Sequence, residues 1–161
     1  TCVILSLNTR NQLQALILKR SDNESEGPGL WTVPGGKVEE EDFGPEVPTK
    51  NIPVHEGVLD RAVIRETRGE VGILLRAEQI MTMQKKALVF IRKNGTPTMV
   101  HRYFALCGHA PAVVVGNEAT DYAWITHDRL SRYDFISNVG EDIFVAMREC
   151  VAHYKHLNLK I

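Results

Sequence analysis

GVLDRAVIRETRGEVGI, residues 57–73, is the stretch around which the fold of this chain is organised. Its apolar residues recur at near-helical spacing and Gly72 provides a stop, so the stretch predicts one amphipathic helix. Glu66 and Glu70 are four residues apart and therefore project from the same side of that helix. Two such carboxylates repel each other unless a cation lies between them, and Mg²⁺ prefers oxygen ligands of this kind. The pair alone does not require a metal, because surface helices are rich in glutamate.

The upstream segment LWTVPGGKVE, residues 30–39, makes a metal site the better interpretation. An apolar strand runs directly into Pro34-Gly35-Gly36, which predicts a tight turn whose bare backbone can approach a ligand. We therefore expect this turn and the two helix carboxylates to form one site.

Together these two segments resemble the Nudix hydrolases. Their box is G-x5-E-x7-R-E-U-x-E-E-x-G-U, where U is apolar, and it usually follows a Trp-x-x-Pro-Gly-Gly strand end. This chain has WTVPGG at residues 31–36 and RETRGEVGI at residues 65–73. Only this part of the chain carries motif residues.

The chain departs from the box in four places. The run from Gly36 to Gly57 is 15 residues longer than the box allows. Three positions carry an unexpected residue type: Gly57 in place of the first Glu, Thr67 in place of an apolar residue, and Gly69 in place of the first acid of the Glu-Glu pair. Glu56, directly before Gly57, is a candidate replacement for the missing acid.

The resemblance implies an α/β fold, namely an α/β/α sandwich with a mixed β-sheet, formed by a single domain over residues 1–161. The order of predicted elements, strands, helix, strands and helix, implies the same architecture. The implied activity is metal-dependent hydrolysis of the diphosphate linkage in a nucleoside diphosphate linked to another group. The expected cofactor is Mg²⁺, with Mn²⁺ as an alternative, and the expected partner is a small nucleotide-type substrate.

The resemblance also implies roles for particular residues. Metal would be held by the carbonyl of Gly35 together with Glu66 and Glu70. Catalysis would further use Arg65, which orients a helix carboxylate through a charge-assisted hydrogen bond. A polar segment precedes the predicted strand with Trp124, and either of its acids, Glu118 or Asp121, could serve as general base. The remaining candidates contact the substrate: Arg20, Gly36 and Lys37.

Gly69 is the main objection to catalysis, because it removes one carboxylate from the metal cluster. It also places Gly inside a helix, which costs about 0.5–1 kcal/mol relative to Ala. The alternative function is therefore a catalytically decayed module of the same fold that binds a nucleotide-type ligand or a protein partner.

Length and composition exclude several other classes of function. A chain of 161 residues with a formal net charge of -1 indicates one globular domain with no bulk nucleic acid and no membrane surface as partner. Cys2, Cys107 and Cys150 are too few and too far apart for a disulfide framework, which suits a reducing, cytoplasmic location. The six histidines lack zinc-ligand spacing. A homodimer is possible, and the start at Thr1 leaves room for a leading segment.

The remaining elements follow from alternation, turn residues and helical spacing. The sequence predicts turns at residues 8–11 and 94–95 and a closing helix over 140–156, and it leaves 77–86 ambiguous. Predicted strands cover residues 2–7, 13–19, 30–33, 87–92, 98–107 and 123–126.

Residues 39–55 form an acidic, proline-containing insertion. They carry five acids and three prolines; the prolines should prevent a helix, and the acids should not pack into a core. We expect an exposed, mobile loop beside the site, acting either as a lid or specificity element or simply as a tolerated surface insertion. The substrate itself is not named by any further motif. Four aromatics could stack on a base, although aromatics in strands are more often core: Trp31, Tyr103, Phe104 and Tyr122.

Overall fold

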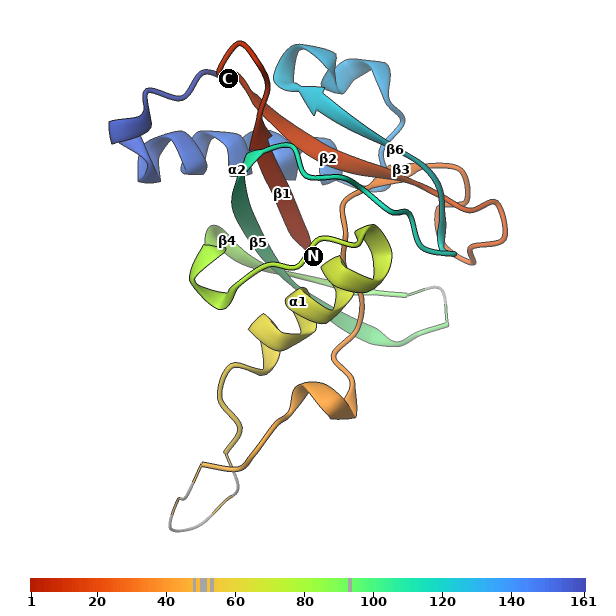
Figure 1. The fold of residues 1–161 in the computed structure, drawn as a ribbon. Coiled ribbons are helices and arrows are strands. Elements are labelled where there is room, and N and C mark those ends of the chain that lie inside the picture. The colour runs from red at the N-terminus through yellow and green to blue at the C-terminus, as the bar shows by residue number, and fades with distance from the viewer. Residues whose placement is uncertain (48, 50–51, 53, 93) are drawn as a thin grey trace.

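The computed structural model describes residues 1–47, 49, 52, 54–92 and 94–161. Figure 1 shows a twisted sheet with one long helix on each side. The helices are α1 (Val58–Val71) and α2 (Val139–His153), and four short 3₁₀ turns accompany them: η1 (Glu40–Asp42), η2 (Ala77–Gln79), η3 (His127–Arg132) and η4 (Lys155–Leu157). The strands are β1 (Cys2–Leu7), β2 (Leu13–Arg20), β3 (Trp31–Thr32), β4 (Ile80–Ile91), β5 (Pro97–His109) and β6 (Ala119–Thr126).

The sheet is mixed. Its strand order is β3-β2-β1-β5-β4, and β6 pairs with β2 in addition. The β1–β5 pair is parallel, whereas the other pairs are antiparallel. The predicted turn between β1 and β2 is present, and the Asn8 side chain fixes it by accepting the backbone N–H groups of Arg10 and Gln12 at 2.9 and 3.0 Å.

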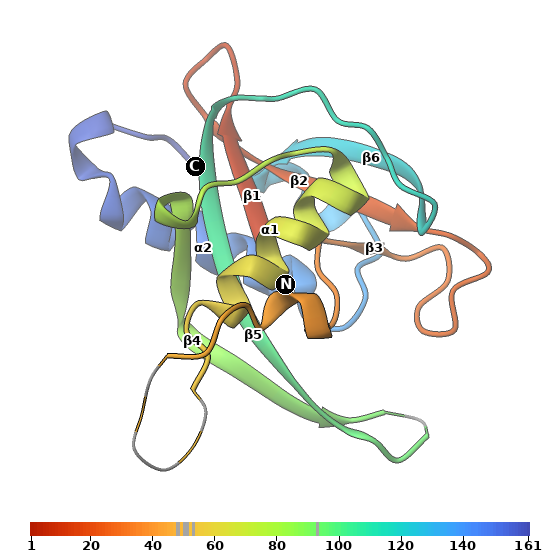
Figure 2. The ribbon, with the colours of Figure 1, turned by 60° about the horizontal axis from the view of Figure 1, so that its bottom comes forward.

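Alternation along the central strands divides the core between the two faces of the sheet. On one face, Val63 and Val71 of α1 pack with Ile4 and Leu16. On the other, the apolar stripe of α2 packs with the opposite face of the same strands, through Val3, Leu5, Ile17, Ile143 and Met147. Figure 2 shows the sheet lying between the two helices. The predicted α/β/α sandwich is thus confirmed.

Helix α1 has a glycine at each end for a conformational reason. Gly57 precedes the helix and Gly72 follows it, with φ of 67° and 69°, values that favour glycine over residues with a Cβ. The Gly72 N–H closes the helix by donating to Arg68 and Thr67 carbonyls. Thr67 fits an apolar position because its buried hydroxyl donates to the Ile64 carbonyl at 3.2 Å.

Three predicted boundaries are wrong. The ambiguous residues 77–86 form η2 and the start of β4, because Ile80 to Thr82 pair with β5. Strand β6 begins at Ala119 rather than at residue 123, since β2 extends the pairing backward through Tyr122 and Asp121. Helix α2 ends at His153, earlier than expected, because the chain turns into η4.

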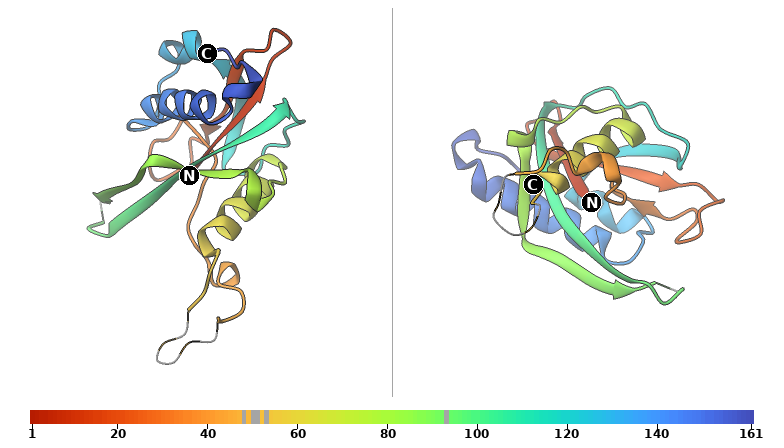
Figure 3. Two further views of the ribbon diagram at one scale, coloured as in Figure 1. Left: turned by 90° about the vertical axis from the view of Figure 1, so that its left-hand side faces the viewer. Right: turned by 90° about the horizontal axis from the view of Figure 1, so that it is seen from below.

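No disulfide joins the three cysteines, as expected from their spacing; all are free, and Cys2 and Cys150 are buried. Within the described residues, none of the helices combines the length and the apolar character needed to span a bilayer. Figure 3 shows that the described parts of the chain next to η1 and before α1 lie away from the sheet, beyond the N-terminal end of α1.

Candidate active site

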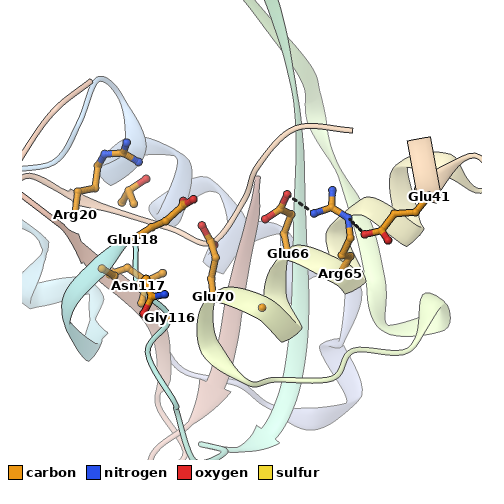
Figure 4. Close-up of a pocket in the computed structure, with 12 residues that line it drawn as sticks. Arg20, Glu41, Arg65, Glu66, Glu70, Gly116, Asn117 and Glu118 are labelled. Atoms are coloured by element: carbon orange, nitrogen blue, oxygen red, sulfur yellow. Dashed lines mark hydrogen bonds and ion pairs between the residues drawn. The ribbon is translucent and has the colours of Figure 1, made fainter. Parts of the chain in front are cut away.

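A cavity of about 440 Å³ opens beside the C-terminal half of α1. It lies between that helix, the end of β2 and the segment that leads into β6. The charged side chains in its lining are Arg20, Glu41, Arg65, Glu66, Glu70 and Glu118. Figure 4 shows Glu66 and Glu70 on the helix, with Glu118 and Arg20 across from Glu70. The fold therefore collects these groups from four segments that are distant in sequence.

Glu70 connects the helix to the glycine turn. Its Oε2 accepts the backbone N–H of Gly35 at 2.8 Å, which ties the end of β3 to α1. Burial, together with the nearby charges of Glu66 and Glu118, raises the pKa of Glu70 to about 7. The Gly35 hydrogen bond opposes this rise, because it stabilises the carboxylate. Glu70 is thus a half-buried acid beside two other carboxylates, whose effect the charge of Arg20 only partly offsets.

Glu66 lies against the second glycine of the turn. A Cβ on Gly36 would overlap the Glu66 carboxylate, so any side chain at residue 36 would displace that carboxylate. Here glycine is required by close approach rather than by its backbone angles. The Pro-Gly-Gly turn and the two helix carboxylates are therefore adjacent, as expected from the sequence.

Arg65 holds Glu66 through an ion pair of 2.8 Å from its Nη1 to Oε1. The rest of its guanidinium is bound by Asp42, with Nε–Oδ1 at 3.1 Å and Nη2–Oδ2 at 2.9 Å. Arg65 also donates to the Lys37 carbonyl at 2.7 Å. This two-pronged contact holds the pKa of the Asp42 carboxyl below its usual range.

The Asp42 contact corrects the sequence interpretation at residues 56 and 57. Gly57 does not mark a missing partner of Arg65, because Asp42 supplies the carboxylate. Glu56 does not replace it either, since its side chain is exposed and its carbonyl accepts from Arg61 at 2.7 Å. The signal was present in the sequence: five residues separate Gly36 from Asp42, as the box requires. The extra residues therefore follow the first acid of the box rather than precede it.

The insertion is also less detached than expected. Asp42 is buried, with 2% of its surface exposed, because Arg65 and the Glu39 N–H satisfy its carboxylate. Arg61 secures the same segment by donating to the carbonyls of Asp42 and Phe43, each at 2.6 Å. The prediction that no acid of this cluster is buried is therefore wrong. Of the positions expected to be mobile, 48, 50, 51 and 53 lie outside the described residues.

The other candidates differ in their placement. Glu118 lines the cavity, and its carbonyl accepts from Ser21 at 2.9 Å, which fixes the segment. Asp121 is not in the lining, because it alternates with Tyr122 and shares the opposite face of β6 with Ala123 and Ile125. Arg20 lines the cavity but is paired with Glu24 at 2.6 Å.

The Lys37 side chain is exposed and does not line the cavity, and the Lys37 carbonyl accepts a hydrogen bond from Arg65. The structure thus brings six of the expected residues together at the turn and the cavity and leaves Lys37 and Asp121 outside the lining. The six are Gly35, Gly36, Glu66, Glu70, Arg65 and Glu118, and Arg20 lies at the rim with its own partner.

The donor set suits a hard divalent cation. Glu66, Glu70 and Glu118 offer carboxylate oxygens. The negative charges of Glu66 and Glu118 raise the pKa of Glu70, and a cation bound between the three would relieve this repulsion. In the part of the chain described, no three His, Cys, Asp or Glu side chains are already gathered closely enough to hold a metal ion. The candidate donors are therefore Glu66 and Glu70 on the helix, with Glu118 reaching toward Glu70 from the other wall of the cavity (Figure 4).

The family model described as NUDIX domain matches residues 1–143 of this chain. None of the curated protein sequences compared with it matches. Among solved structures, the NUDIX domain of Shewanella oneidensis NrtR complexed with ADP ribose has a TM-score of 0.70 at 17% identity, over 92% of this chain and 84% of that chain. An Alicyclobacillus acidocaldarius NUDIX hydrolase has a TM-score of 0.70 at 16% identity, over 100% of this chain and 95% of that chain. A C. elegans Ap4A hydrolase binary complex has a TM-score of 0.62 at 22% identity, over 96% of this chain and 95% of that chain. At these identities the likeness concerns the fold.

Proposed function

The chain belongs to the Nudix family, and we propose that it is a metal-dependent hydrolase that cleaves the diphosphate linkage of a nucleoside diphosphate linked to another group. The observation that carries this proposal is the junction of α1 with the glycine turn. There the Glu70 carboxylate accepts the Gly35 N–H while Glu66 lies against Gly36, at the edge of a cavity that Arg20 also lines.

Glu66 and Glu70 are the proposed metal ligands, with the Gly35 carbonyl as a third and Mg²⁺ or Mn²⁺ as the ion. When bound, the ion would neutralise charge on the phosphate oxygens and activate the attacking water. Arg65 positions Glu66, and Asp42 in turn positions Arg65. The second layer of contacts matters because metal ligands need fixed orientations.

Glu118 is the proposed general base. It lines the cavity with Glu70 and carries a carboxylate that can accept a proton from water. Asp121 is the weaker candidate, since it lies on the other face of β6. Arg20 would bind substrate phosphate after exchanging its Glu24 partner, since a guanidinium binds phosphate oxygens in the same forked geometry as a carboxylate.

A screen of nucleotide substrates with Mg²⁺ and Mn²⁺, reading released phosphate after phosphatase treatment, tests the activity. ADP-ribose and Ap4A belong in that screen, because structural neighbours are an ADP ribose complex and an Ap4A hydrolase. Metal-dependent cleavage of one nucleotide supports the proposal. Inert behaviour toward every compound, with metal binding intact, would favour the alternative module.

Metal affinity is expected to depend on pH around neutrality. Glu70 has a pKa of about 7, so protons compete with metal at this ligand as the pH falls below 7. The dissociation constant for Mn²⁺ should rise about fivefold between pH 7 and pH 6, and change little above pH 8. Calorimetric titration at several pH values measures this. A flat profile from pH 6 to 8 would mean that Glu70 does not bind the ion.

A binding module without hydrolysis is the second candidate, and Gly69 favours it. This residue lines the cavity and supplies no carboxylate beside Glu70. A Cβ at residue 69 would meet no atom within 4 Å, so the site has open space where the usual acid would lie. Residue 69 therefore lacks a carboxylate but does not lack space, so a substitution can restore the missing acid.

Gly69→Glu is expected to tighten Mn²⁺ binding at least about tenfold and to raise any hydrolysis, because it adds a carboxylate at the cavity. Gly69→Gln is the matched control, since it brings the same size and similar helix propensity without charge. Both variants should gain up to about 1 kcal/mol of helix stability. Isothermal titration and initial rates compare the two. Equal metal affinity in both variants would exclude residue 69 from the metal site.

A further inference from the structure

A second cavity, of about 410 Å³, lies at the other end of the β2–β6 pair. Its lining includes Gln14 and Trp124, whereas the first cavity begins at Leu18. Gln14 and Leu18 are four positions apart on β2, a distance of about 13 Å at the usual rise of a strand. The two linings share no residue. In Figure 1 this end of the molecule carries the β1–β2 turn and η3, opposite the insertion.

Two arginines line this second cavity from different segments. Arg10 comes from the β1–β2 turn and Arg129 from η3. Neither guanidinium makes a hydrogen bond or ion pair with any other part of the described chain, whereas Arg20, Arg61 and Arg65 all do. Arg129 interacts electrostatically with the adjacent Asp128, but its guanidinium makes no hydrogen bond or ion pair within the described chain. Two guanidiniums that face one cavity in this way suit an anion with several oxygens, such as a phosphate.

Two further groups restrict the kind of anion. The Trp124 indole lines the cavity, and its N–H has no partner among the described residues, so a flat ring and a free donor are both available. Asp128 also lines the cavity and accepts the Thr126 hydroxyl at 2.5 Å. That bond holds the pKa of the Asp128 carboxyl below its usual value. A bare anion would be repelled by Asp128, whereas the hydroxyl groups of a sugar would donate to it.

We propose that this cavity binds a nucleoside monophosphate, with the phosphate held by Arg10 and Arg129, a ribose hydroxyl by Asp128, and the base beside Trp124. The site is separate from the proposed hydrolytic cavity and needs no metal. Because the two linings share no residue, this cavity can hold its ligand while the first cavity holds substrate.

Tryptophan fluorescence tests the proposal directly, because the chain has two tryptophans and only Trp124 lies in this cavity. In a Trp31→Phe background, AMP titrated in the presence of EDTA should change the emission of Trp124 in a saturable manner. Combined Arg10→Gln and Arg129→Gln substitutions should weaken this binding at least about tenfold, since both charged contacts are lost. Both arginines are exposed, so the variant should melt like its parent.

Arg20→Gln with Glu70→Gln, in the same background, is the control for the first cavity and should leave the response unchanged. A response that persists without Arg10 and Arg129, or that vanishes in this control, would overturn the proposal. So would the absence of any response to AMP. Inorganic phosphate is the last probe. Binding as tight as that of AMP would show an anion site without nucleotide recognition. The assay excludes metal and turnover, so its result is independent of hydrolysis.

Discussion

Glu70→Gln is expected to lower hydrolysis by at least about 10²-fold while leaving the fold intact. A metal ion contributes several kcal/mol of transition-state stabilisation, and each 1.36 kcal/mol corresponds to a factor of ten in rate. The amide oxygen of Gln can still accept the Gly35 N–H that Glu70 accepts at 2.8 Å. The substitution therefore removes the charge proposed to bind metal but keeps the hydrogen bond that joins α1 to the turn.

The same substitution should stabilise the metal-free protein above neutral pH. Glu70 has an ordinary pKa of 4.5 and a folded-state pKa of about 7, because burial disfavours its charge. A group whose pKa is raised by folding stabilises the fold fully below pH 4.5, and this stabilisation is lost as the pH rises through about 7. Wild type should thus lose unfolding free energy over that window, by about 3 kcal/mol at most. Glu70→Gln should show no such loss, because its amide does not titrate.

Thermal melts with and without Mn²⁺ from pH 4.5 to 8 measure both effects. Metal at about 100 times its dissociation constant adds about 2.7 kcal/mol to wild type, and should add nothing comparable to Glu70→Gln. Glu78→Gln is the control, because that glutamate is exposed on η2 and lies outside the cavity. Hydrolysis within tenfold of wild type in Glu70→Gln would remove this residue from the metal site and contradict the proposed mechanism.

Local patterns were sufficient for the elements that carry the proposed metal ligands. Helix α1 has both its apolar face and its terminal glycines within residues 57–73, so the positions of Glu66 and Glu70 on one side follow from spacing alone. The Gly35–Gly36 turn is equally local. That the turn contacts these two carboxylates is a tertiary fact. It was expected because a bare glycine turn can approach a ligand, and because the two segments resemble one family motif.

Strand boundaries near the site depended on pairing that the local sequence does not encode. Residues 117–122 are polar enough to predict a loop, yet Ala119 already pairs with Arg20 of β2. Once the segment from Ala119 onward is a strand, alternation sends Asp121 and Tyr122 to opposite faces. Glu118, just outside the strand, remains at the cavity. Two acids that looked equivalent in the sequence are thereby separated by the sheet.

Asp42 shows a different limit of sequence interpretation. In a run of four consecutive acids, one carboxylate is buried and the others are exposed, and only the position of Arg65 decides which. The 22 residues between Asp42 and Arg65 hide a contact that the uninterrupted box would have made obvious. The motif is therefore more complete than it looks. Among the described residues, the acid expected at residue 69, where this chain has Gly, is the one box carboxylate for which no other residue substitutes.

Asp42→Asn is expected to destabilise the protein by about 2–3 kcal/mol and to reduce hydrolysis about tenfold or more. Removing one partner of a buried pair costs about 3–5 kcal/mol, and the cost is smaller here because the Arg65 side chain is 25% exposed. The new amide would also place a donor group against the guanidinium. Loss of rate follows because Arg65 would hold Glu66 less firmly, as expected for a group that orients a metal ligand.

Glu41→Gln is the matched control, since it makes the same chemical change at the adjacent residue. The Glu41 carboxylate also approaches Arg65, at 3.3 Å, but its side chain is 68% exposed, and exposed pairs contribute about 0–1 kcal/mol. Urea unfolding at pH 7 should therefore separate the two variants by at least about 1 kcal/mol. Equal, small effects would mean that burial of Asp42 does not anchor the insertion. A large stability loss with unchanged KM and kcat would instead limit Asp42 to a structural role and leave Glu66 positioned by the glycine turn alone.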